Sequence, residues 1–493
     1  MISKRNESIL YFLLGFGLFM FTRYSRIVPS IPITILIAPI FILRFIRIQP
    51  AKRGIWLTLF GFLLSINTAL WGLFEFDDIS LMASYSLVRS SLIALVWFLP
   101  FMVDRLIYPK FEDKGFWSTL TFPTISTAIF FLSSLEGPLD DGSGTISSFS
   151  YGSLTFIQSR SMFGVWIYVF FYSLLFSVVN SFWENRFKWN KIKSVAIIYL
   201  SVTLLIFLVG TIKTEFANPG SDKVKIAAIV LIPEDGKAVR MERIFNGKIT
   251  SQFEKTISRI GNSVKKASQN GAKIVSFQEF AMTINEDEKS ELVKHYKRIA
   301  RKNNIFLSIT YAYFVEEGKG ENIHLFIDNK GEVQLDYTKR YLLGFGPFGE
   351  TAVFKKGSEI IQSIDTPYGK IGISICRDMG FPSYIRQAGR NNVDIMLSPS
   401  YDWPKSFDPW YLTGTIENGF SFVRPTYNGL SYAADYNGNI LASMDSDATV
   451  DGIMYAEVPV KGIKTLYPII GDLIGWLCVI GLLGMIVFRK RDK

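Results

Sequence analysis

The chain has 493 residues, of which 49% are hydrophobic, 15% aromatic and only 19% charged. Because soluble domains contain about 25% charged residues, this composition excludes a disordered chain, a fibrous repeat and an ordinary cytosolic enzyme. The 53 Lys and Arg residues exceed the 43 Asp and Glu residues, which gives a formal net charge of +10. In so apolar a chain, such an excess is typical of the basic cytoplasmic loops of membrane proteins, so we expect no nucleic acid partner.

Long apolar segments predict membrane-spanning helices. A spanning helix needs about 20 predominantly apolar residues, because lipid offers the backbone amides no hydrogen-bond partner. We identify eight such segments, at roughly 7–22, 27–46, 54–74, 83–103, 116–135, 162–183, 194–212 and 467–488. We therefore expect a seven-helix membrane domain over residues 1–215 and a final transmembrane helix with a basic tail over residues 465–493.

Basic residues between these segments indicate the orientation of the chain. Loops rich in Lys and Arg remain in the cytoplasm, and both termini and alternate loops carry such clusters. Arg23 and Arg26 in the first outer loop are the exception. The pattern predicts that both termini are cytoplasmic and that residues 220–462 lie outside the cytoplasm. The clusters are Lys4 and Arg5; Arg44, Arg47, Lys52 and Arg53; Arg105, Lys110 and Lys114; Arg186, Lys188, Lys191 and Lys193; Arg489, Lys490, Arg491 and Lys493.

Residues 220–462 alternate β-rich runs with amphipathic helical stretches. Such alternation predicts an α/β domain with a central sheet covered by helices. The expected helices lie at 250–269, 288–302 and 382–389. The expected strands lie at 223–232, 273–277, 304–314, 370–375, 393–398, 420–425, 429–436 and 453–458, with a further β-rich region at 321–338.

Cys376 is the candidate nucleophile. The other cysteine, Cys478, lies in the last apolar segment, where a small apolar side chain is its expected role. The cysteines and the histidines have no spacing typical of a zinc site or a disulfide framework, so we expect no metal. Cys376 follows the predicted strand 371–375, at the carboxyl end where open α/β sheets place their reactive groups. A buried, inert thiol is the alternative interpretation.

A cysteine nucleophile needs a base, because a free thiol has a pKa of about 8.5. His295 and His324 are better explained as surface or structural residues, so we expect a carboxylate. Glu279 closes a predicted strand and precedes apolar residues, which would raise its pKa toward that of a general base. Lys339 follows another β-like run and could stabilise both a thiolate and an oxyanion. Each of these charged residues, taken singly, is more often a surface charge.

Taken together, these residues resemble a known triad. Glu279, Lys339 and Cys376 resemble, in order and approximate spacing, the Glu-Lys-Cys triad of the nitrilase superfamily. The most specific string is Cys-x-Asp-x-x-Phe-Pro, which begins at Cys376. The predicted membrane helices before and after such a domain are similar to those of one family within it, the apolipoprotein N-acyltransferases. The resemblance extends over essentially the whole chain and implies a nitrilase-like sandwich domain at 220–462, on the periplasmic face of a bacterial inner membrane, without a cofactor.

This resemblance also implies a reaction in two steps. The Cys376 thiol would attack an ester carbonyl of a phospholipid, with Glu279 accepting the thiol proton and Lys339 stabilising the oxyanion. The acyl-thioester would then be attacked by the α-amine of an S-diacylglyceryl-cysteine at the N-terminus of an apolipoprotein. The implied partners are therefore a phospholipid acyl donor, a diacylglyceryl-modified apolipoprotein acceptor and the lipid bilayer.

Further site residues are carried over from segments similar to the family's motifs. Glu350 is expected to be a second active-site carboxylate, although a short insertion separates it from Lys339 relative to the family pattern. Asp378 comes from the Cys-x-Asp string, and Trp403 from a run similar to the family's Asn-Asp-Ala-Trp region. Departures from the family pattern, such as this insertion, bear on substrate preference more than on the type of reaction. A membrane-tethered amidase or carbon-nitrogen hydrolase, with water as acceptor, and a non-catalytic membrane scaffold remain as alternatives.

Overall fold

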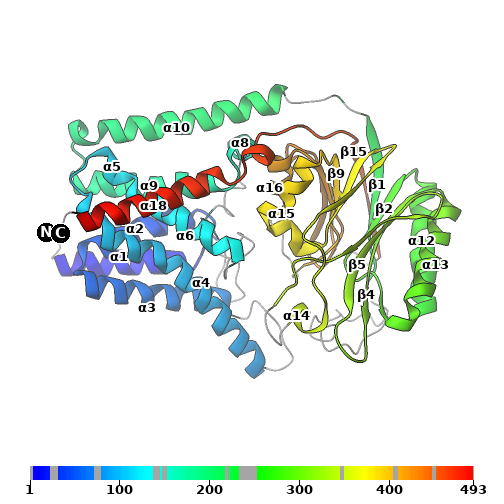
Figure 1. Ribbon diagram of the computed structural model, residues 1–493. Coiled ribbons are helices and arrows are strands. Elements are labelled where there is room, and N and C mark those ends of the chain that lie inside the picture. The colour runs from blue at the N-terminus through cyan, green and yellow to red at the C-terminus, as the bar shows by residue number, and fades with distance from the viewer. Residues whose placement is uncertain are drawn as a thin grey trace. The chain divides into compact units, whose positions relative to one another are not determined.

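The chain folds into two compact units in this computed structural model (Figure 1). The helical unit comprises Met1–Ser159, Phe163–Gly210 and Asp472–Lys493, and the α/β unit comprises Arg160–Met162 and Thr211–Gly471. The structure describes residues 4–22, 31–71, 79–136, 145–146, 153–216, 220, 222–232, 252–344, 349–402, 409–446 and 451–491.

Helices occupy the described part of every segment predicted to span a membrane. The long ones are α1 (Lys4–Phe19), α2 (Thr34–Ile48), α3 (Ala51–Leu70), α4 (Ile79–Ile107), α6 (Thr121–Glu136), α9 (Trp166–Glu184), α10 (Trp189–Phe216) and α18 (Leu473–Arg491). Short helices and turns between them are η1 (Tyr108–Lys110), α5 (Phe116–Thr119), α7 (Leu154–Ile157) and α8 (Arg160–Phe163).

Not all of these helices reach the length and apolarity needed to cross a membrane. Within the described residues, five stretches do: Ala51–Leu70, Ser86–Lys110, Phe116–Leu135, Trp166–Glu184 and Trp189–Phe216. The apolar helices Asn6–Phe19 and Leu473–Val487 are shorter, and α2 has 15 residues. Eight crossings therefore stay a prediction.

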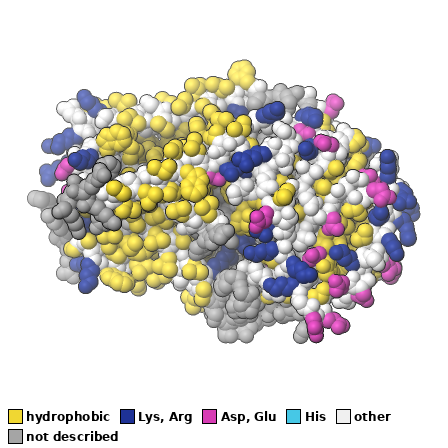
Figure 2. All heavy atoms as spheres, in the orientation of Figure 1, with side chains coloured by type: hydrophobic (Ala, Val, Ile, Leu, Met, Phe, Trp, Pro, Cys, Tyr) yellow, Lys and Arg dark blue, Asp and Glu magenta, His cyan; other side chains and the backbone are white. Residues whose placement is uncertain are grey.

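The surface of the helical unit is apolar. Figure 2 shows hydrophobic side chains gathered over its helices, whereas charged side chains are spread over the α/β unit. Large apolar residues on α3 and α10 are strongly exposed, including Trp56 at 63% and Leu204 at 70%.

The last predicted span is interrupted, which corrects the expectation of one helix from residue 467. A short helix, α17 (Tyr467–Ile470), ends at Gly471, and α18 begins at Leu473. Gly471 has a φ of 61°, a conformation that glycine adopts without steric cost. A Cβ atom at this position would lie 1.9 Å from Nη1 of Arg386, so a larger residue would require that flexible side chain to move.

Two β-sheets form the centre of the α/β unit. The first has the order β15-β1-β2-β4-β5-β6, with β3 also paired to β4. Its strands are β1 (Lys223–Val230), β2 (Ile274–Phe277), β3 (Thr283–Asn285), β4 (Phe306–Phe314), β5 (Glu321–Ile327), β6 (Val333–Thr338) and β15 (Gly452–Pro459). In this sheet β1, β2 and β4 are parallel neighbours, while β5, β6 and β15 pair antiparallel.

The second sheet has the order β14-β13-β11-β9-β8-β7. Its strands are β7 (Gln362–Thr366), β8 (Gly369–Ile373), β9 (Ile395–Leu397), β11 (Ser421–Arg424), β13 (Leu430–Ala434) and β14 (Ile440–Asp445). A separate two-stranded pair joins β10 (Ser400–Tyr401) to β12 (Thr426–Tyr427) in parallel. Parallel neighbours β8, β9 and β11 are connected through helices, as in βαβ units.

The sheets stack face to face, and helices cover both outer faces (Figure 1). Helices α12 (Phe253–Gln269) and α13 (Lys289–Asn303) lie outside the first sheet, and α15 (Pro382–Arg390) and α16 (Pro409–Asn418) outside the second. Short elements are η3 (Glu286–Glu288), α14 (Glu350–Val353) and η4 (Cys376–Gly380). The predicted α/β sandwich is confirmed by this arrangement.

His324 of β5 lies between the two sheets. Its Nε2 is 2.6 Å from the Ser308 hydroxyl on β4, and its Nδ1 is 3.0 Å from the carbonyl oxygen of Ser374, which follows β8. Burial lowers the pKa of His324 to about 4, so the ring is neutral at physiological pH and acts as a hydrogen-bonding link between the sheets.

Candidate active site

The carboxyl ends of β2, β6 and β8 bring the predicted triad together. Glu279 comes shortly after β2, Lys339 directly after β6 and Cys376 shortly after β8. Since β4 is parallel to β2 and antiparallel to β5, and β5 is antiparallel to β6, strands β2 and β6 end at the same edge. The Glu279 amide donates to Ser400 O at 3.3 Å and the Cys376 amide to Pro399 O at 2.8 Å, so one short segment holds both turns.

Lys339 lies between two carboxylates. Its Nζ donates to Oε1 of Glu279 and to Oε1 of Glu350, each at 2.8 Å. Glu279 and Lys339 are each 1% exposed, and Glu350 is fully buried. The structure therefore brings the predicted second carboxylate to the triad despite the insertion, because Glu350 starts α14 and its Oε2 accepts from the Leu343 amide at 2.7 Å.

Asn322 is a member of the site that sequence reasoning missed. Its Nδ2 donates to Glu279 Oε1 at 2.8 Å and lies 3.4 Å from Glu350 Oε1, and the side chain is buried. Its carbonyl oxygen accepts from the Lys339 amide at 2.9 Å. Asn322 lies next to Ile323, which pairs with Thr338 of β6. The pairing of β5 with β6 therefore brings Asn322 to Lys339, and no local sequence motif indicates this.

The turn after β2 aims Glu279 at the site. Phe280 has a φ of 54°, which turns the chain sharply after the carboxylate. Gln278 anchors the turn to β1, since its side chain bonds the amide of Leu231 at 3.2 Å and the carbonyl of Leu231 at 3.0 Å. The second oxygen of Glu279, Oε2, accepts from the Tyr401 amide at 2.9 Å.

Cys376 has a strained backbone and a partly exposed side chain. Its φ of 47° lies in the left-handed region, which is uncommon for a residue with a Cβ. Strain of this kind persists where surrounding contacts enforce it, often at functional sites. The Sγ atom lies 4.0 Å from Tyr401 O, next to the amide that holds Glu279. Cys376 is therefore the partly exposed residue of an otherwise buried group.

The charges of the site act on the pKa of each triad residue. Burial and the Glu279 carboxylate raise the pKa of the Cys376 thiol to about 12, against the opposing charges of Lys339 and Arg424. Burial also raises the pKa of Glu279, although the Lys339 ammonium partly offsets it. Burial favours a neutral Lys339, but the two carboxylates outweigh it and raise the pKa well above the usual value. The resting site thus holds a protonated thiol beside a carboxylate able to accept its proton.

Asp378 stabilises the turn that contains Cys376. Its Oδ2 accepts from the Tyr337 hydroxyl at 2.6 Å and from the Ile375 amide at 3.0 Å, and its Oδ1 accepts from the Tyr341 amide at 2.7 Å. Burial raises the pKa of Asp378 to about 6, and these donors oppose the shift. These contacts describe a positioning residue, and the predicted role of Asp378 in supporting the active site stays a prediction.

Arg424 is a second residue absent from the predicted site. It is 1% exposed, and its Nη2 donates to Asp402 Oδ1 and to Ser400 Oγ, each at 2.6 Å. Its guanidinium lies 4.3 Å from the ring centroid of Tyr411. Burial lowers the pKa of Arg424, but the Asp402 carboxylate outweighs this effect and raises it. Trp403, which was predicted as a site residue and follows Asp402 in the sequence, lies outside the described residues.

Among the residues that the structure describes, no group of three or more His, Cys, Asp or Glu side chains is arranged to hold a metal ion. His295 lies on α13, where its Nε2 is 3.8 Å from Glu291. Cys478 is buried in α18, as expected for a small apolar residue. The contacts of Glu279, Lys339 and Cys376 can support nucleophilic attack by a thiol, proton transfer to Glu279 and stabilisation of an oxyanion by Lys339.

Comparison with known proteins agrees with this chemistry. Residues 238–467 match the carbon-nitrogen hydrolase family model. A deaminated glutathione amidase from Dictyostelium discoideum is 32% identical over 124 residues, covering 23% of this chain and 42% of the relative. A citrullinase from Francisella tularensis is 27% identical over 244 residues, covering 41% of this chain and 82% of the relative.

Another relative carries a different activity in its name. An apolipoprotein N-acyltransferase from Shewanella oneidensis is 27% identical over 153 residues, covering 28% of each chain. Among solved structures, an amidase from Nesterenkonia sp. AN1 superposes with a TM-score of 0.39 and 16% identity, covering 48% of this chain and 94% of that one. The alignment with the amidase from Dictyostelium spans about two fifths of that relative's length, 42%.

Proposed function

We propose, on the premise that the C-terminal part of this chain is a carbon-nitrogen hydrolase domain of the nitrilase superfamily, that the protein is a membrane-bound N-acyltransferase. One observation carries the proposal. The partly exposed residue Cys376 lies beside a buried Glu–Lys–Glu cluster, in a chain whose helical unit has helices long and apolar enough to cross a membrane. An acyl donor and an acceptor that are both anchored in lipid fit this combination.

In the first step, Cys376 Sγ attacks the ester carbonyl of a phospholipid. The pKa of the thiol favours its protonated form, so attack is coupled to transfer of the proton to Glu279. The Lys339 ammonium stabilises the negative charge that develops on the carbonyl oxygen. The C–O bond then breaks, Glu279 returns the proton to the leaving alkoxide, and a lysophospholipid departs from an acyl-thioester on Cys376.

In the second step, an amine replaces the thiolate. The α-amine of an S-diacylglyceryl-cysteine, at the N-terminus of an apolipoprotein, attacks the thioester carbonyl. Glu279 accepts the amine proton, the C–S bond breaks and Cys376 leaves with its proton restored. Glu350 keeps Lys339 charged and in position through both steps, because it shares the Lys339 ammonium with Glu279.

The helical unit supports a membrane location for both substrates. Transfer of exposed apolar side chains such as Trp56 and Leu204 from water to hydrocarbon lowers the free energy. The alternation of basic clusters predicts that the α/β unit lies on the side opposite the cytoplasm. The proposal is therefore a multi-pass protein of a bacterial inner membrane, with the reaction at the periplasmic leaflet.

A second candidate function is a membrane-tethered amidase in which water attacks the thioester. The observation that favours it is the similarity to proteins named deaminated glutathione amidase and citrullinase. The triad serves either reaction, since only the acceptor differs.

A transfer assay separates the two candidates. Membranes containing the protein are incubated with a phospholipid that carries a tagged acyl chain, with Cys376→Ala as the inactive variant and Cys478→Ala as the matched control. We expect a hydroxylamine-sensitive tag that requires Cys376 and passes to a diacylglyceryl-cysteine peptide. Release of the tag only as free fatty acid would favour the hydrolase, and absence of any tag would contradict acyl transfer from phospholipid.

A further inference from the structure

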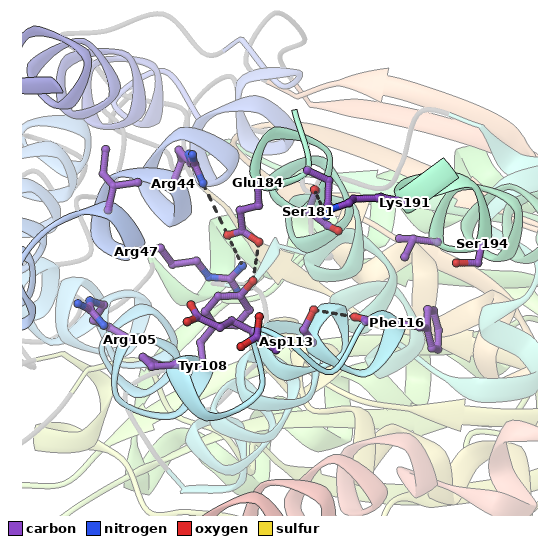
Figure 3. A pocket seen from close by; sticks show the side chains of 17 residues that line it. Arg44, Arg47, Arg105, Tyr108, Asp113, Phe116, Ser181, Glu184, Lys191 and Ser194 are labelled. Atoms are coloured by element: carbon purple, nitrogen blue, oxygen red, sulfur yellow. Dashed lines mark hydrogen bonds and ion pairs between the residues drawn. The ribbon is translucent and has the colours of Figure 1, made fainter. Parts of the chain in front are cut away.

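A cavity of about 600 Å³ lies in the helical unit, where the ends of several helices meet (Figure 3). It is formed by the C-terminal ends of α2, α4 and α9, the loop after α4 and the first turns of α10. These segments carry the basic clusters that predict a cytoplasmic location. Its charged lining residues are Arg44, Arg47, Arg105, Glu112, Asp113, Glu184 and Lys191.

Two of these cations, Arg47 and Arg44, already form ion pairs with carboxylates. Arg47 donates to both oxygens of Asp104, at 2.9 and 3.0 Å, and its guanidinium lies 3.4 Å from the ring centroid of Tyr108. Glu184 accepts from the Tyr108 hydroxyl at 2.5 Å and lies 3.6 Å from Arg44 and 3.7 Å from Arg47. Figure 3 shows this carboxylate between the arginines. Arg47 therefore belongs to the framework of the helical unit.

Two side-chain nitrogen atoms at the cavity, in the part of the chain that the structure describes, have no hydrogen-bond acceptor. Among the described residues, Nε of Arg44 and Nε of Arg105 are buried without a hydrogen-bond partner. Arg105 uses its Nη2 on Gln49 O at 2.9 Å, which fixes the guanidinium while leaving Nε free. Lys191 lines the cavity with an exposed side chain. Arg44 and Arg105 are partly exposed and Lys191 is exposed, so their cationic groups can reach an anion that supplies oxygen atoms.

The size and charge of the cavity restrict the anion. A volume of about 600 Å³ is within the range of small-ligand sites. Glu112 and Asp113 also line it and are exposed, so they disfavour a multiply charged anion such as a polyphosphate. A single phosphodiester presents four oxygens and one negative charge, which suits Arg44, Arg105 and Lys191. Because the cavity lies at helix ends, where a bilayer places its headgroups, the phosphodiester of a lipid is the source that fits.

We propose that this cavity binds the phosphate of a phospholipid headgroup from the cytoplasmic leaflet. Arg44 and Arg105 donate to the phosphate oxygens, and Lys191 adds charge at the entrance. The site lies in the helical unit, whereas Cys376 belongs to the α/β unit, and we assign the site no part in acyl transfer. The proposal rests on the membrane insertion proposed above and is independent of the transfer reaction.

Lipid binding to the full-length protein in detergent tests this assignment. Native mass spectrometry with added phosphatidylglycerol measures the affinity of the most tightly held lipid. We expect Arg44→Gln with Arg105→Gln to weaken this binding about tenfold or more. The matched control is Lys52→Gln with Arg53→Gln, which removes the same charge from exposed positions of the neighbouring basic cluster and should leave binding unchanged.

The outcomes distinguish the sources of phosphate. Equal affinity in the wild-type protein and the Arg44/Arg105 variant would overturn the proposal, as would an equal loss in the Lys52/Arg53 control. Displacement of the lipid by millimolar inorganic phosphate would overturn the lipid as the source. If the double variant fails to fold, Lys191→Gln replaces an exposed side chain and should still weaken lipid binding several-fold; unchanged binding there would count against the site.

Discussion

At neutral pH the Cys376 thiol is protonated, because burial and Glu279 raise its pKa to about 12. Below that pKa, the thiolate fraction grows about tenfold per pH unit, so alkylation of Cys376 by iodoacetamide should accelerate steeply through the alkaline range. Arg424 opposes the rise in the pKa of Cys376. Its replacement in Arg424→Gln should raise the pKa further and slow alkylation several-fold at any fixed pH below it.

Peptide-resolved mass spectrometry measures this rate separately for Cys376 and Cys478. Arg340→Gln is the matched control, because the Arg340 guanidinium pairs with Glu359, whose side chain is 79% exposed. Faster alkylation in Arg424→Gln, or an equal change in Arg340→Gln, would contradict the assigned electrostatic effect.

Asn322 holds two carboxylates near one ammonium. In Asn322→Ala the carboxylate oxygens lose a buried donor, at a cost of about 1–3 kcal/mol in the free energy of unfolding. Because Glu279 is then less well held, we expect acylation of Cys376 to slow by about tenfold or more. The tagged-acyl assay measures the rate and thermal unfolding measures stability.

The control for this change is Asn329→Ala, whose amide bonds Asn304 Oδ1 in an exposed loop. A normal acylation rate in Asn322→Ala would show that Lys339 and the Tyr401 amide are sufficient to position Glu279.

At the scale of elements, Arg47 joins α2 to α4 through Asp104, and the two side chains are 4% and 0% exposed. Replacing one partner leaves a buried charge, which costs about 3–5 kcal/mol. Arg47→Met should therefore lower the unfolding temperature of the detergent-solubilised protein markedly. The double variant Arg47→Met with Asp104→Leu should recover much of the loss, since it removes both charges.

Arg53→Met provides the comparison on an exposed face of α3. If the double variant is no more stable than Arg47→Met, the ion pair is not the origin of the destabilisation.

Edge strands illustrate the limit of sequence patterns at this scale. Strands β7 and β14 were not among the predicted strands, because their residues are polar or partly exposed and show no continuous apolar run. They exist because β8 and β13 offer unpaired backbone groups to them. The helix interruption at Gly471 was not predicted either, and there the chain adopts a φ of 61° that glycine favours.

For the whole molecule, we predict that the α/β unit lies outside the cytoplasm, and thiol labelling tests this orientation. In a Cys376→Ala and Cys478→Ala background, single cysteines are placed at exposed positions of each unit, as Lys265→Cys on α12 and Arg53→Cys on α3. A thiol reagent that does not cross membranes should label residue 265 from the outer side of intact spheroplasts. It should label residue 53 only after the membrane is opened.

The reverse labelling pattern would place the α/β unit in the cytoplasm and would remove the lipoprotein acceptor from reach. Labelling of both positions without opening the membrane would contradict an intact barrier in the assay, which a cytosolic marker protein controls for.

The sequence by itself determined the features that depend on local composition. Apolar segments predicted the positions of the helices in the helical unit, and periodicity predicted most strands and helices of the α/β unit, because segment length and side-chain alternation are local properties. The order and spacing of Glu279, Lys339 and Cys376 also indicated a candidate triad, and the catalytic roles of these three residues stay a prediction.

Only the tertiary structure decided how these residues are held. Asn322 and Arg424 reach the site through the pairing of strands distant in sequence, and Asp378 supports the Cys376 turn. The cavity lined by Arg44 and Arg105 likewise forms where separate helices end together. Hydrogen-bond partners and unpaired donors depend on the positions of atoms many residues apart, and a linear pattern carries no record of that geometry.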